Sequence, residues 1–318
     1  MADDQLIVIT GASGHVGGRL FMHFCTATDR QVRPHFRAII PLPTWAVSHT
    51  ATLGDLREHS VRMNALRDAD VVIHLATRGY SSSKPPSPSQ LAAERAATVD
   101  LIRDAAASGV SRFVLISSIH VLGDALVGDV TDSTTPYPTT DYGRSRLELE
   151  REVEGQSLAT SMTGIVLRMT NTFGVPAIAQ PSTWDLLIHD LCRQAVTSDR
   201  LVLHSNGSGY RNFLALSDAV NVITEVATHT VPSGTYLLAD PQTFQLREVA
   251  ETVRIRAEHL LQKSLTVDVN TTDMTQHQPF TVKDESLRAL GIVMQDNFIG
   301  ELDRLILAAR KEFGEPSS

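Results

Sequence analysis

The sequence predicts a doubly wound α/β fold: a parallel sheet with helices on both faces, then a smaller C-terminal α/β lobe interleaved with the end of the sheet. Two observations predict the sheet. Short apolar runs alternate with longer helical stretches in the first half of the chain, and a glycine-rich turn directly follows the first run. Beyond about residue 171 the alternation gives way to scattered helices, which predicts the second lobe.

The predicted strands are apolar on both faces. Residues 6–10 form a β-branched run without polar alternation, which is typical of a strand buried on both sides in a parallel sheet. Similar runs follow at residues 36–40, 71–75, 113–117 and 165–169. Longer stretches with a helical pattern, such as residues 89–108, separate them, so we expect right-handed crossovers.

The second lobe is predicted from helical stretches and short strands. The helices are residues 184–197, 246–262 and 297–313, and the strands lie near Leu201 and Thr235. A chain of 318 residues suits one large domain or two modest ones. We expect residues 1–174 to form the domain with the glycine-rich turn, and residues 175–318 to form the smaller lobe, with some sheet elements shared.

Two stretches do not fit regular elements. Residues 81–89, rich in serine and proline, follow a predicted strand at the edge where open α/β sheets place their ligands. They form either a mobile lid or an ordinary surface loop, and composition does not separate the two. Residues 123–141, rich in Thr, Pro and Asp, are the second predicted loop.

The composition excludes several classes of protein. A net charge of -8, from 36 acidic and 28 basic residues, argues against nucleic acid or an anionic membrane as partner. The N-terminal apolar stretch is too short for a signal peptide and no later run approaches membrane-spanning length, so we expect a cytoplasmic location. Cys25 and Cys192 lack metal-ligand spacing, so we expect buried thiols and no metal site.

The glycine-rich turn predicts a dinucleotide site. Gly11 allows the tight reversal, Gly14 lets the backbone approach a pyrophosphate, and Gly17 lets the helix pack on the strand. The following helix presents its N-terminal N–H groups and partial positive charge to the anion. The remaining predicted cofactor contacts of the turn are Ser13, His15 and Val16.

The choice between NAD and NADP depends on the end of the second strand. An acid there binds the ribose hydroxyls of NAD, and an arginine there binds the 2′-phosphate of NADP. With a strand over residues 36–40 that position holds Pro41, and Arg37 lies earlier on the strand. We therefore expect NAD or NADP, with a slight preference for NAD. Asp55, after a third short strand, is placed to meet an adenine amino group or to cap the next helix.

A second group of residues predicts proton chemistry. The strand over residues 113–117 leads into Ser118 and His120, and Tyr142 lies at the start of a later helical stretch. Tyr142 and Arg146 are four residues apart and therefore share one helix face. A fixed cation favours the ionised form of a nearby phenol, which suits proton transfer. The Ser118 hydroxyl is placed to bind the same substrate oxygen.

These motifs, taken in order, resemble the extended short-chain dehydrogenases/reductases of the NAD-dependent epimerase/dehydratase group over essentially the whole chain. The matching stretches are residues 11–17, 54–55, 72–76, 113–123, 142–146, 167–174, 207–213, Asp218 and residues 290–291.

The resemblance implies a Rossmann domain that holds NAD(P) and a C-terminal lobe that holds a nucleotide sugar. It implies Tyr142 as the acid/base, Ser118 as its hydrogen-bonding helper, and Arg146 in the place of the lysine that holds the nicotinamide ribose. Further cofactor contacts are implied at Asp55, Leu56, Leu75 and Ala76, and substrate contacts at Asn171 and Arg211.

The chain departs from the pattern of that group at several positions. Arg146 stays charged but is longer, planar and unable to lose a proton, so the site is either maintained or repurposed. Glu94 stands where an asparagine is usual. Ile119 and His120 stand where the dehydratases carry an acidic pair, which disfavours elimination of water. His120 is therefore either a substrate-binding or auxiliary acid/base group, or a packed histidine.

We expect an NAD(P)-dependent enzyme that acts on a nucleotide-activated sugar, as an epimerase or a ketoreductase. One alternative is a reductase of a small uncharged ketone or alcohol. Another is a non-catalytic dinucleotide-binding regulator, which Arg146 would suit. The resemblance also implies a homodimer through a four-helix contact that residues 89–108 and 142–154 would supply.

Overall fold

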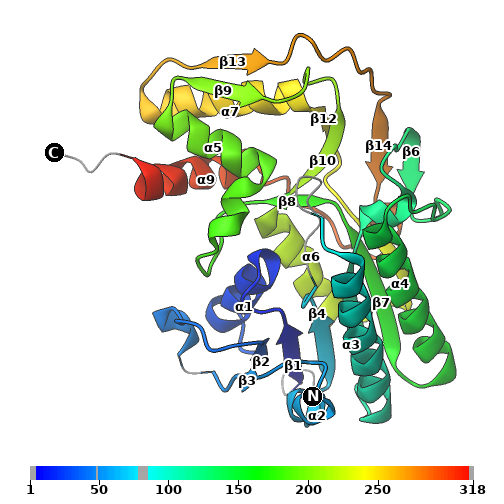
Figure 1. The fold of residues 1–318 in the computed structure, drawn as a ribbon. Coiled ribbons are helices and arrows are strands. Elements are labelled where there is room, and N and C mark those ends of the chain that lie inside the picture. Colours follow the sequence, from blue (N-terminus) through cyan, green and yellow to red (C-terminus); the bar gives the residue numbers. More distant parts are fainter. Residues whose placement is uncertain (1–4, 48, 78–84, 315–318) are drawn as a thin grey trace.

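The computed structural model describes residues 5–47, 49–77 and 85–314 and has a seven-stranded sheet below a smaller second lobe (Figure 1). All neighbouring strands of the sheet are parallel. In spatial order they are β11 (Gly234–Leu238), β7 (Thr163–Met169), β5 (Arg112–Ser118), β4 (Val71–His74), β1 (Leu6–Thr10), β2 (Gln31–Phe36) and β3 (Thr52–Leu53).

Helices cover both faces of this sheet. On one face lie α1 (His15–Ala27) and α6 (Leu216–Thr228), packed on alternate strand residues such as Ile7 and Ile73. On the other lie α2 (His59–Leu66), α3 (Pro88–Ala107) and α4 (Asp141–Ala159), packed on the intervening residues such as Val8 and Val72. The doubly wound fold is therefore confirmed, and so are the strands predicted at residues 6–10, 71–75, 113–117 and 165–169.

The second strand was predicted in the wrong place. It runs from Gln31 to Phe36, not over residues 36–40. Pro34 and the polar residues around it hide the strand in the sequence, but β3 pairs only with the last two residues of β2, so the first part of β2 is a sheet edge where proline is tolerated. The first residue after the strand is therefore Arg37, which is exposed, and not Pro41.

The second lobe has its own core. Helices α5 (Leu187–Thr197), α7 (Leu246–Leu261) and α9 (Phe298–Phe313) confirm the three predicted helices and pack together around it. Two small sheets complete the lobe. One contains β8 (Asn171–Phe173), β10 (Tyr210–Ala215) and β12 (Thr243–Gln245), and the other contains β9 (Arg200–Leu203) and β13 (Thr266–Val269). Short helices elsewhere in the described residues include η1 (Thr44–Ala46), η3 (Pro181–Asp185) and α8 (Glu285–Ala289).

The chain crosses between the two parts more than once. Helix α6 and strand β11 come after the first elements of the second lobe in the sequence. Strand β11 nevertheless belongs to the large sheet, and α6 packs on one face of it. The domain boundary at residue 174 stays a prediction. So does the homodimer, although α3 and α4 do lie side by side, joined by an ion pair between Arg103 and Glu152 at 2.8 Å (Figure 1).

The two predicted loops differ from expectation in part. Residues 123–141 are not loop throughout, because η2 (Ile119–Leu122) is followed by β6 (Gly128–Thr131), which pairs with the distant β14 (Phe280–Lys283). The predicted lid lies partly outside the described residues, at 81–84. Ser87 caps α3 in a capping box with Gln90, so the end of the predicted lid belongs to this helix start. Within the described ranges, no helix has the length and apolarity needed to cross a membrane.

The turn between β1 and α1 is packed too tightly for side chains. Gly11 has a φ of +71°, and a Cβ there would lie 2.6 Å from the carbonyl carbon of Leu75. A Cβ on Gly17 would lie 2.1 Å from the Gly11 carbonyl oxygen. The close packing of helix on strand therefore requires glycine at Gly17, as predicted.

We expect Gly17→Ala to destabilise the fold by about 3 kcal/mol, because the methyl group meets a backbone oxygen that cannot move aside cheaply. Urea unfolding measures this. The matched control is Gly155→Ala in α4, where a Cβ meets nothing within 4 Å. This variant is expected to gain about 1 kcal/mol from helix propensity. Equal stability of the two variants would contradict the packing argument.

Stability should also fall in mild acid because His74 is buried. Its ring hydrogen-bonds Thr10 at 2.8 Å and Thr98 at 3.2 Å. Burial first, and then the nearby charges of Arg146 and His35, lowers the pKa of His74 from 6.5 to about 3. Between these values the unfolded chain binds the proton and the folded chain does not, so stability falls as the pH falls.

Urea unfolding at pH 7 and pH 5 should show that His74 lowers the free energy of unfolding by about 2 kcal/mol at the lower pH. His74→Gln should reduce the difference by that amount, whereas His229→Gln at an exposed position should not. An unchanged pH dependence in the His74 variant would contradict a neutral buried ring.

Candidate active site

The turn after β1 leaves polar groups without protein partners. Gly14 is the N-cap of α1, with no side-chain cap and no acidic residue in the first turn. His15 follows, and both its ring nitrogens are buried without a hydrogen-bond partner in the described part of the chain. Burial, then the charges of His189 and Arg19, lowers the pKa of His15 to about 3. A neutral imidazole and uncapped helix amides therefore lie together, as an anionic ligand with polar groups requires.

The other predicted residues of the turn have different roles. The Ser13 carbonyl accepts a hydrogen bond from the Gln180 side chain, and Val16 is buried in the core of the large sheet. The backbone of Leu75 and Ala76 lies against Gly11. The structure therefore brings Leu75 and Ala76 to the glycine-rich turn.

The adenosine end of the predicted site carries two arginines. Asp55 accepts hydrogen bonds from the Arg57 backbone and guanidinium, at 2.6 to 3.0 Å. The Arg57 side chain first, then its backbone N–H, lowers the pKa of Asp55 to about 2. Asp55 does not cap α2, whose N-cap is Glu58. Arg37 also lies near enough to lower the pKa of Asp55, and the Leu56 carbonyl accepts a hydrogen bond from Arg62.

The predicted chemical residues meet where α4 packs on η2. A Cβ on Gly143 would lie 2.5 Å from the His120 carbonyl oxygen, so the first turn of α4 lies directly against this backbone. Tyr142, in that turn, is 9% exposed, and its ring centroid lies 6.0 Å from that of His120, edge to face. Ser118 ends β5 and accepts a hydrogen bond from the His120 backbone N–H at 3.3 Å.

Arg146 also contacts the ring of Tyr142. Its guanidinium carbon is 4.9 Å from the centre of the phenol ring, so the cation faces the ring. The side chain is 1% exposed and forms an ion pair with Glu94 of α3 through Nη2. Its Nε and Nη1 are buried and have no hydrogen-bond partner among the described residues. The two departures noted in the sequence, Arg146 and Glu94, are therefore contact partners.

His120 has a second partner that the sequence reasoning missed. Its Nδ1 lies 2.6 Å from Asp124 Oδ1, and the other oxygen of Asp124 accepts a hydrogen bond from Thr139. The charge of Arg211 contributes to lowering the pKa of Asp124, which places the predicted substrate residue Arg211 on this side of the site. The i,i+4 spacing from His120 to Asp124 was the available sequence signal.

Asn171 is less directly connected. It lies on β8, beside Phe213 of β10, and its side-chain amide donates to the Asn212 carbonyl at 3.1 Å. Arg211 is exposed on the same β10 strand. The two predicted substrate residues therefore lie on neighbouring strands of one small sheet.

The unpartnered groups fit a nicotinamide dinucleotide. Arg146 has buried N–H donors beside Tyr142, and His15 has unpartnered ring nitrogens beside the uncapped start of α1. Buried donors of this kind normally have partners. A ligand with a pyrophosphate at one end and ribose hydroxyls farther along would supply hydrogen-bond partners both for the start of α1 with His15 and for Arg146. Groups of three or more His, Cys, Asp or Glu side chains that could hold a metal are absent from the described residues.

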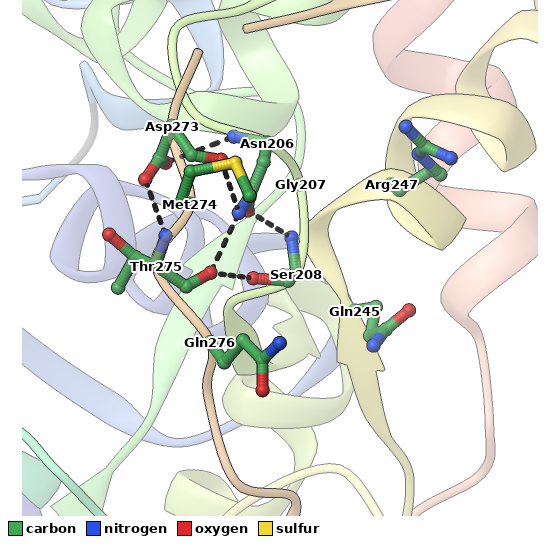
Figure 2. Close-up of a pocket in the computed structure, with 9 residues that line it drawn as sticks. All are labelled: Asn206, Gly207, Ser208, Gln245, Arg247, Asp273, Met274, Thr275 and Gln276. Carbon is green, nitrogen blue, oxygen red and sulfur yellow. Dashed lines mark hydrogen bonds between the residues drawn. The ribbon is translucent and has the colours of Figure 1, made fainter. Parts of the chain in front are cut away.

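A pocket of about 340 Å³ lies in the second lobe, away from these residues (Figure 2). Its polar walls largely satisfy one another: the Asn206 side chain donates to the Thr275 carbonyl at 2.7 Å, and Ser208 Oγ donates to the same oxygen at 3.0 Å. Arg247 faces it from the start of α7. None of the predicted site residues lines this pocket.

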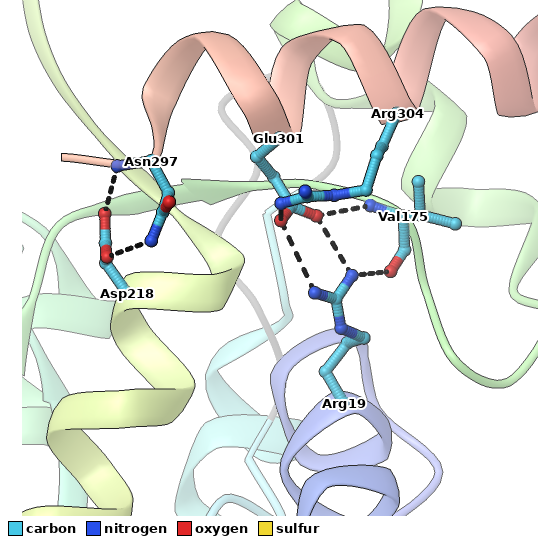
Figure 3. A network of polar contacts seen from close by, with 6 residues as sticks. All are labelled: Arg19, Val175, Asp218, Asn297, Glu301 and Arg304. Carbon is cyan, nitrogen blue, oxygen red and sulfur yellow. Dashed lines mark hydrogen bonds and ion pairs between the residues drawn. The ribbon is translucent and has the colours of Figure 1, made fainter. Parts of the chain in front are cut away.

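One buried carboxylate joins the two lobes (Figure 3). Glu301 of α9 is fully buried and accepts hydrogen bonds from Arg19 of α1 at 2.9 Å, Arg304 at 2.7 Å and the Val175 backbone at 3.2 Å. Burial alone would raise the pKa of Glu301, but the two arginines outweigh it and lower the pKa. The first helix of the nucleotide half is therefore fixed to the last helix of the chain.

Three known proteins are similar to this chain in sequence or in structure. The UDP-glucose 4-epimerase of Vibrio cholerae is 31% identical over 173 residues, which cover 53% of this chain and about half (52%) of that enzyme. The 2'-dehydrokanamycin reductase of Streptomyces kanamyceticus is 25% identical over 260 residues, 79% of this chain and 66% of that enzyme. The structure of MoeE5 in complex with UDP-glucose and NAD matches with a TM-score of 0.79 at 22% identity, covering 97% of this chain and 99% of MoeE5.

The structural likeness shows a shared Rossmann-type fold. A profile of the NAD dependent epimerase/dehydratase family matches residues 7–239, which contain the glycine-rich turn, Ser118, Tyr142 and Arg146. This chain therefore belongs to the NAD-dependent epimerase/dehydratase family.

Proposed function

We propose that this protein is an NAD(P)-dependent enzyme that acts on a nucleotide-activated sugar, as an epimerase or a ketoreductase. The observation that carries the proposal is the position of Tyr142, which is buried and contacts both the guanidinium of Arg146 and the ring of His120. Relatives named as a UDP-glucose 4-epimerase and a dehydrokanamycin reductase support these two reactions. The nicotinamide group, when bound, supplies hydride transfer.

The proposed catalytic residues and the proposed substrate-binding strands have different roles. Tyr142 exchanges a proton with the substrate oxygen, and Ser118 hydrogen-bonds the same oxygen. Arg146 donates its unpartnered N–H groups to the cofactor ribose and keeps positive charge beside the phenol. Asn171 and Arg211 bind the diphosphate of the substrate, where the exposed guanidinium favours an anion.

The pair of Arg146 and Glu94 bears on the alternative of a non-catalytic regulator. Arginine in place of lysine motivated that alternative, but Glu94 fixes the guanidinium against the Tyr142 ring, so a cation still lies beside the phenol. Elimination of water remains disfavoured, because Ile119 is buried in an apolar cluster and cannot act as an acid.

Replacing Tyr142 by phenylalanine tests the proposal. We expect Tyr142→Phe to lower kcat about 10² to 10⁴-fold, because the proton donor is lost while the ring packing remains. Turnover is measured with UDP-sugars and NAD(H) or NADP(H), and dinucleotide binding by calorimetry should change little. The control is Tyr137→Phe, at an exposed tyrosine that is not part of the site. Unchanged turnover in the Tyr142 variant would show that the acid/base assignment is wrong.

The corrected end of β2 changes the expected cofactor preference. Arg37 directly follows the strand, and it is exposed and positively charged, as a 2′-phosphate requires. Asp55 is already paired with Arg57. We therefore propose that the protein binds NADP(H) more tightly than NAD(H), contrary to the slight preference that the sequence suggested.

We expect Arg37→Ala to weaken NADPH binding by about 10 to 100-fold, the range for a lost charge-assisted hydrogen bond, and to leave NADH binding nearly unchanged. Nucleotide fluorescence titrations measure both affinities. Arg151→Ala, at an exposed position on α4, is the control for the loss of one positive charge. A parallel change for NADH and NADPH would refute the assignment.

A further inference from the structure

His120 is held in one orientation from its Nδ1 side. Nδ1 lies 2.6 Å from Asp124 Oδ1, and Thr139 donates to Asp124 Oδ2 at 2.6 Å. Burial alone would raise the pKa of Asp124, but the hydrogen bonds from Thr139 and His120 outweigh it and lower the pKa. A carboxylate can only accept, so Nδ1 carries the proton, and Nε2 is the nitrogen that gains or loses one.

The same ring contacts Tyr142. The two ring planes meet at 79° with centroids 6.0 Å apart. This contact is fixed by the backbone, because Gly143 packs on the His120 carbonyl and the His120 N–H donates to Ser118. Exposure increases outward from the phenol: Tyr142 is 9% exposed, and the side chains of His120 and Asp124 are 25% and 39% exposed. The imidazole therefore contacts the buried phenol and is itself partly open to solvent.

Arg146, the other group in contact with the Tyr142 ring, cannot supply a proton to the phenol. Arg146 is 1% exposed and paired with Glu94, and a guanidinium does not release a proton at working pH. Two further cations in this part of the described structure interact with carboxylates. On the elements that pack on η2, Arg168 of β7 is paired with Glu150 of α4 at 2.8 Å. Arg211 of β10 acts on Asp124 through its charge.

We propose that Asp124 and His120 form a carboxylate–histidine dyad that returns protons from solvent to Tyr142. This inference rests on the proposed role of Tyr142 as acid/base. After Tyr142 gives its proton to the substrate oxygen, the imidazolium form of His120 gives its Nε2 proton to the phenolate: the N–H bond at Nε2 breaks, the O–H bond of Tyr142 forms again, and the neutral imidazole with its proton on Nδ1 remains. The imidazole then takes a proton from solvent, and the negative charge of Asp124 stabilises the imidazolium.

The dyad also bears on the class of reaction. Reduction of a ketone takes up one proton from solvent in each turnover, whereas epimerisation returns the proton within the site. A route from solvent to Tyr142 is therefore required only for the reduction. The dyad favours the ketoreductase alternative of the proposed function.

Four variants of the full chain test the dyad: His120→Ala, Asp124→Asn, Tyr142→Phe and His229→Gln. The last is a matched control, because His229 and Glu225 form an i,i+4 pair at 2.8 Å at the C-terminal end of α6, outside the site. We expect His120→Ala to lower turnover about 10 to 100-fold, with dinucleotide affinity unchanged, and added imidazole to restore much of the rate. Asp124→Asn should lower turnover less and shift the pH profile of kcat. His229→Gln should behave as the wild type.

A second measurement does not depend on turnover. The ultraviolet absorbance of tyrosinate, titrated in wild type and His120→Ala, should show a shifted ionisation for the one tyrosine whose signal disappears in Tyr142→Phe. Absence of imidazole rescue, together with an unchanged pH profile and titration, would overturn the dyad while leaving Tyr142 as the acid/base. Full activity of Tyr142→Phe would instead overturn the proposed function itself.

Discussion

The relative position of the two lobes depends on the buried carboxylate of Glu301. Glu301 accepts hydrogen bonds from a helix of the nucleotide half, from its own helix and from the backbone at Val175. Loss of one partner of a buried pair typically costs 3–5 kcal/mol, because the remaining charge is stranded. Asp218 adds a similar link. It lies on α6, which covers the large sheet, and it accepts hydrogen bonds from Asn297 at the start of α9 (Figure 3). Two buried acids therefore fix where the second lobe lies.

The site itself is assembled from close backbone contacts and from charges that offset one another. Gly11 and Gly17 let β1, β4 and α1 converge, and Gly143 lets α4 reach the turn that carries His120. Arg146 and Glu94 must be considered together, because a buried arginine without its carboxylate would be strongly unfavourable. The group that faces Tyr142 is thus specified by a residue on a different helix.

Much of the fold could be predicted because four of the central strands are apolar runs, and short runs of this kind between helical stretches fit few structures other than buried strands. The second strand was misplaced because Pro34 and its polar neighbours resemble a break in the chain, and the sequence does not reveal that half of β2 is a sheet edge. Strand β6 was missed because its partner, β14, lies about 150 residues away in the sequence, as the pairing of Gly128 with Phe280 shows. Residues brought together by tertiary packing, such as Arg19 and Glu301, leave no local signal. Asp124 was different, since its spacing from His120 was visible.

The position of β11 affects how the protein folds as it is synthesised. This strand pairs with β7 along five residues, yet it emerges from the ribosome only after most of the small sheet of β8 and β10. Until then β7 presents an open, apolar edge, a surface that invites pairing with other chains. An isolated N-terminal segment would keep that edge permanently. Nascent chains of this protein therefore have a period of exposure to aggregation that ends only when residue 238 is free to fold back.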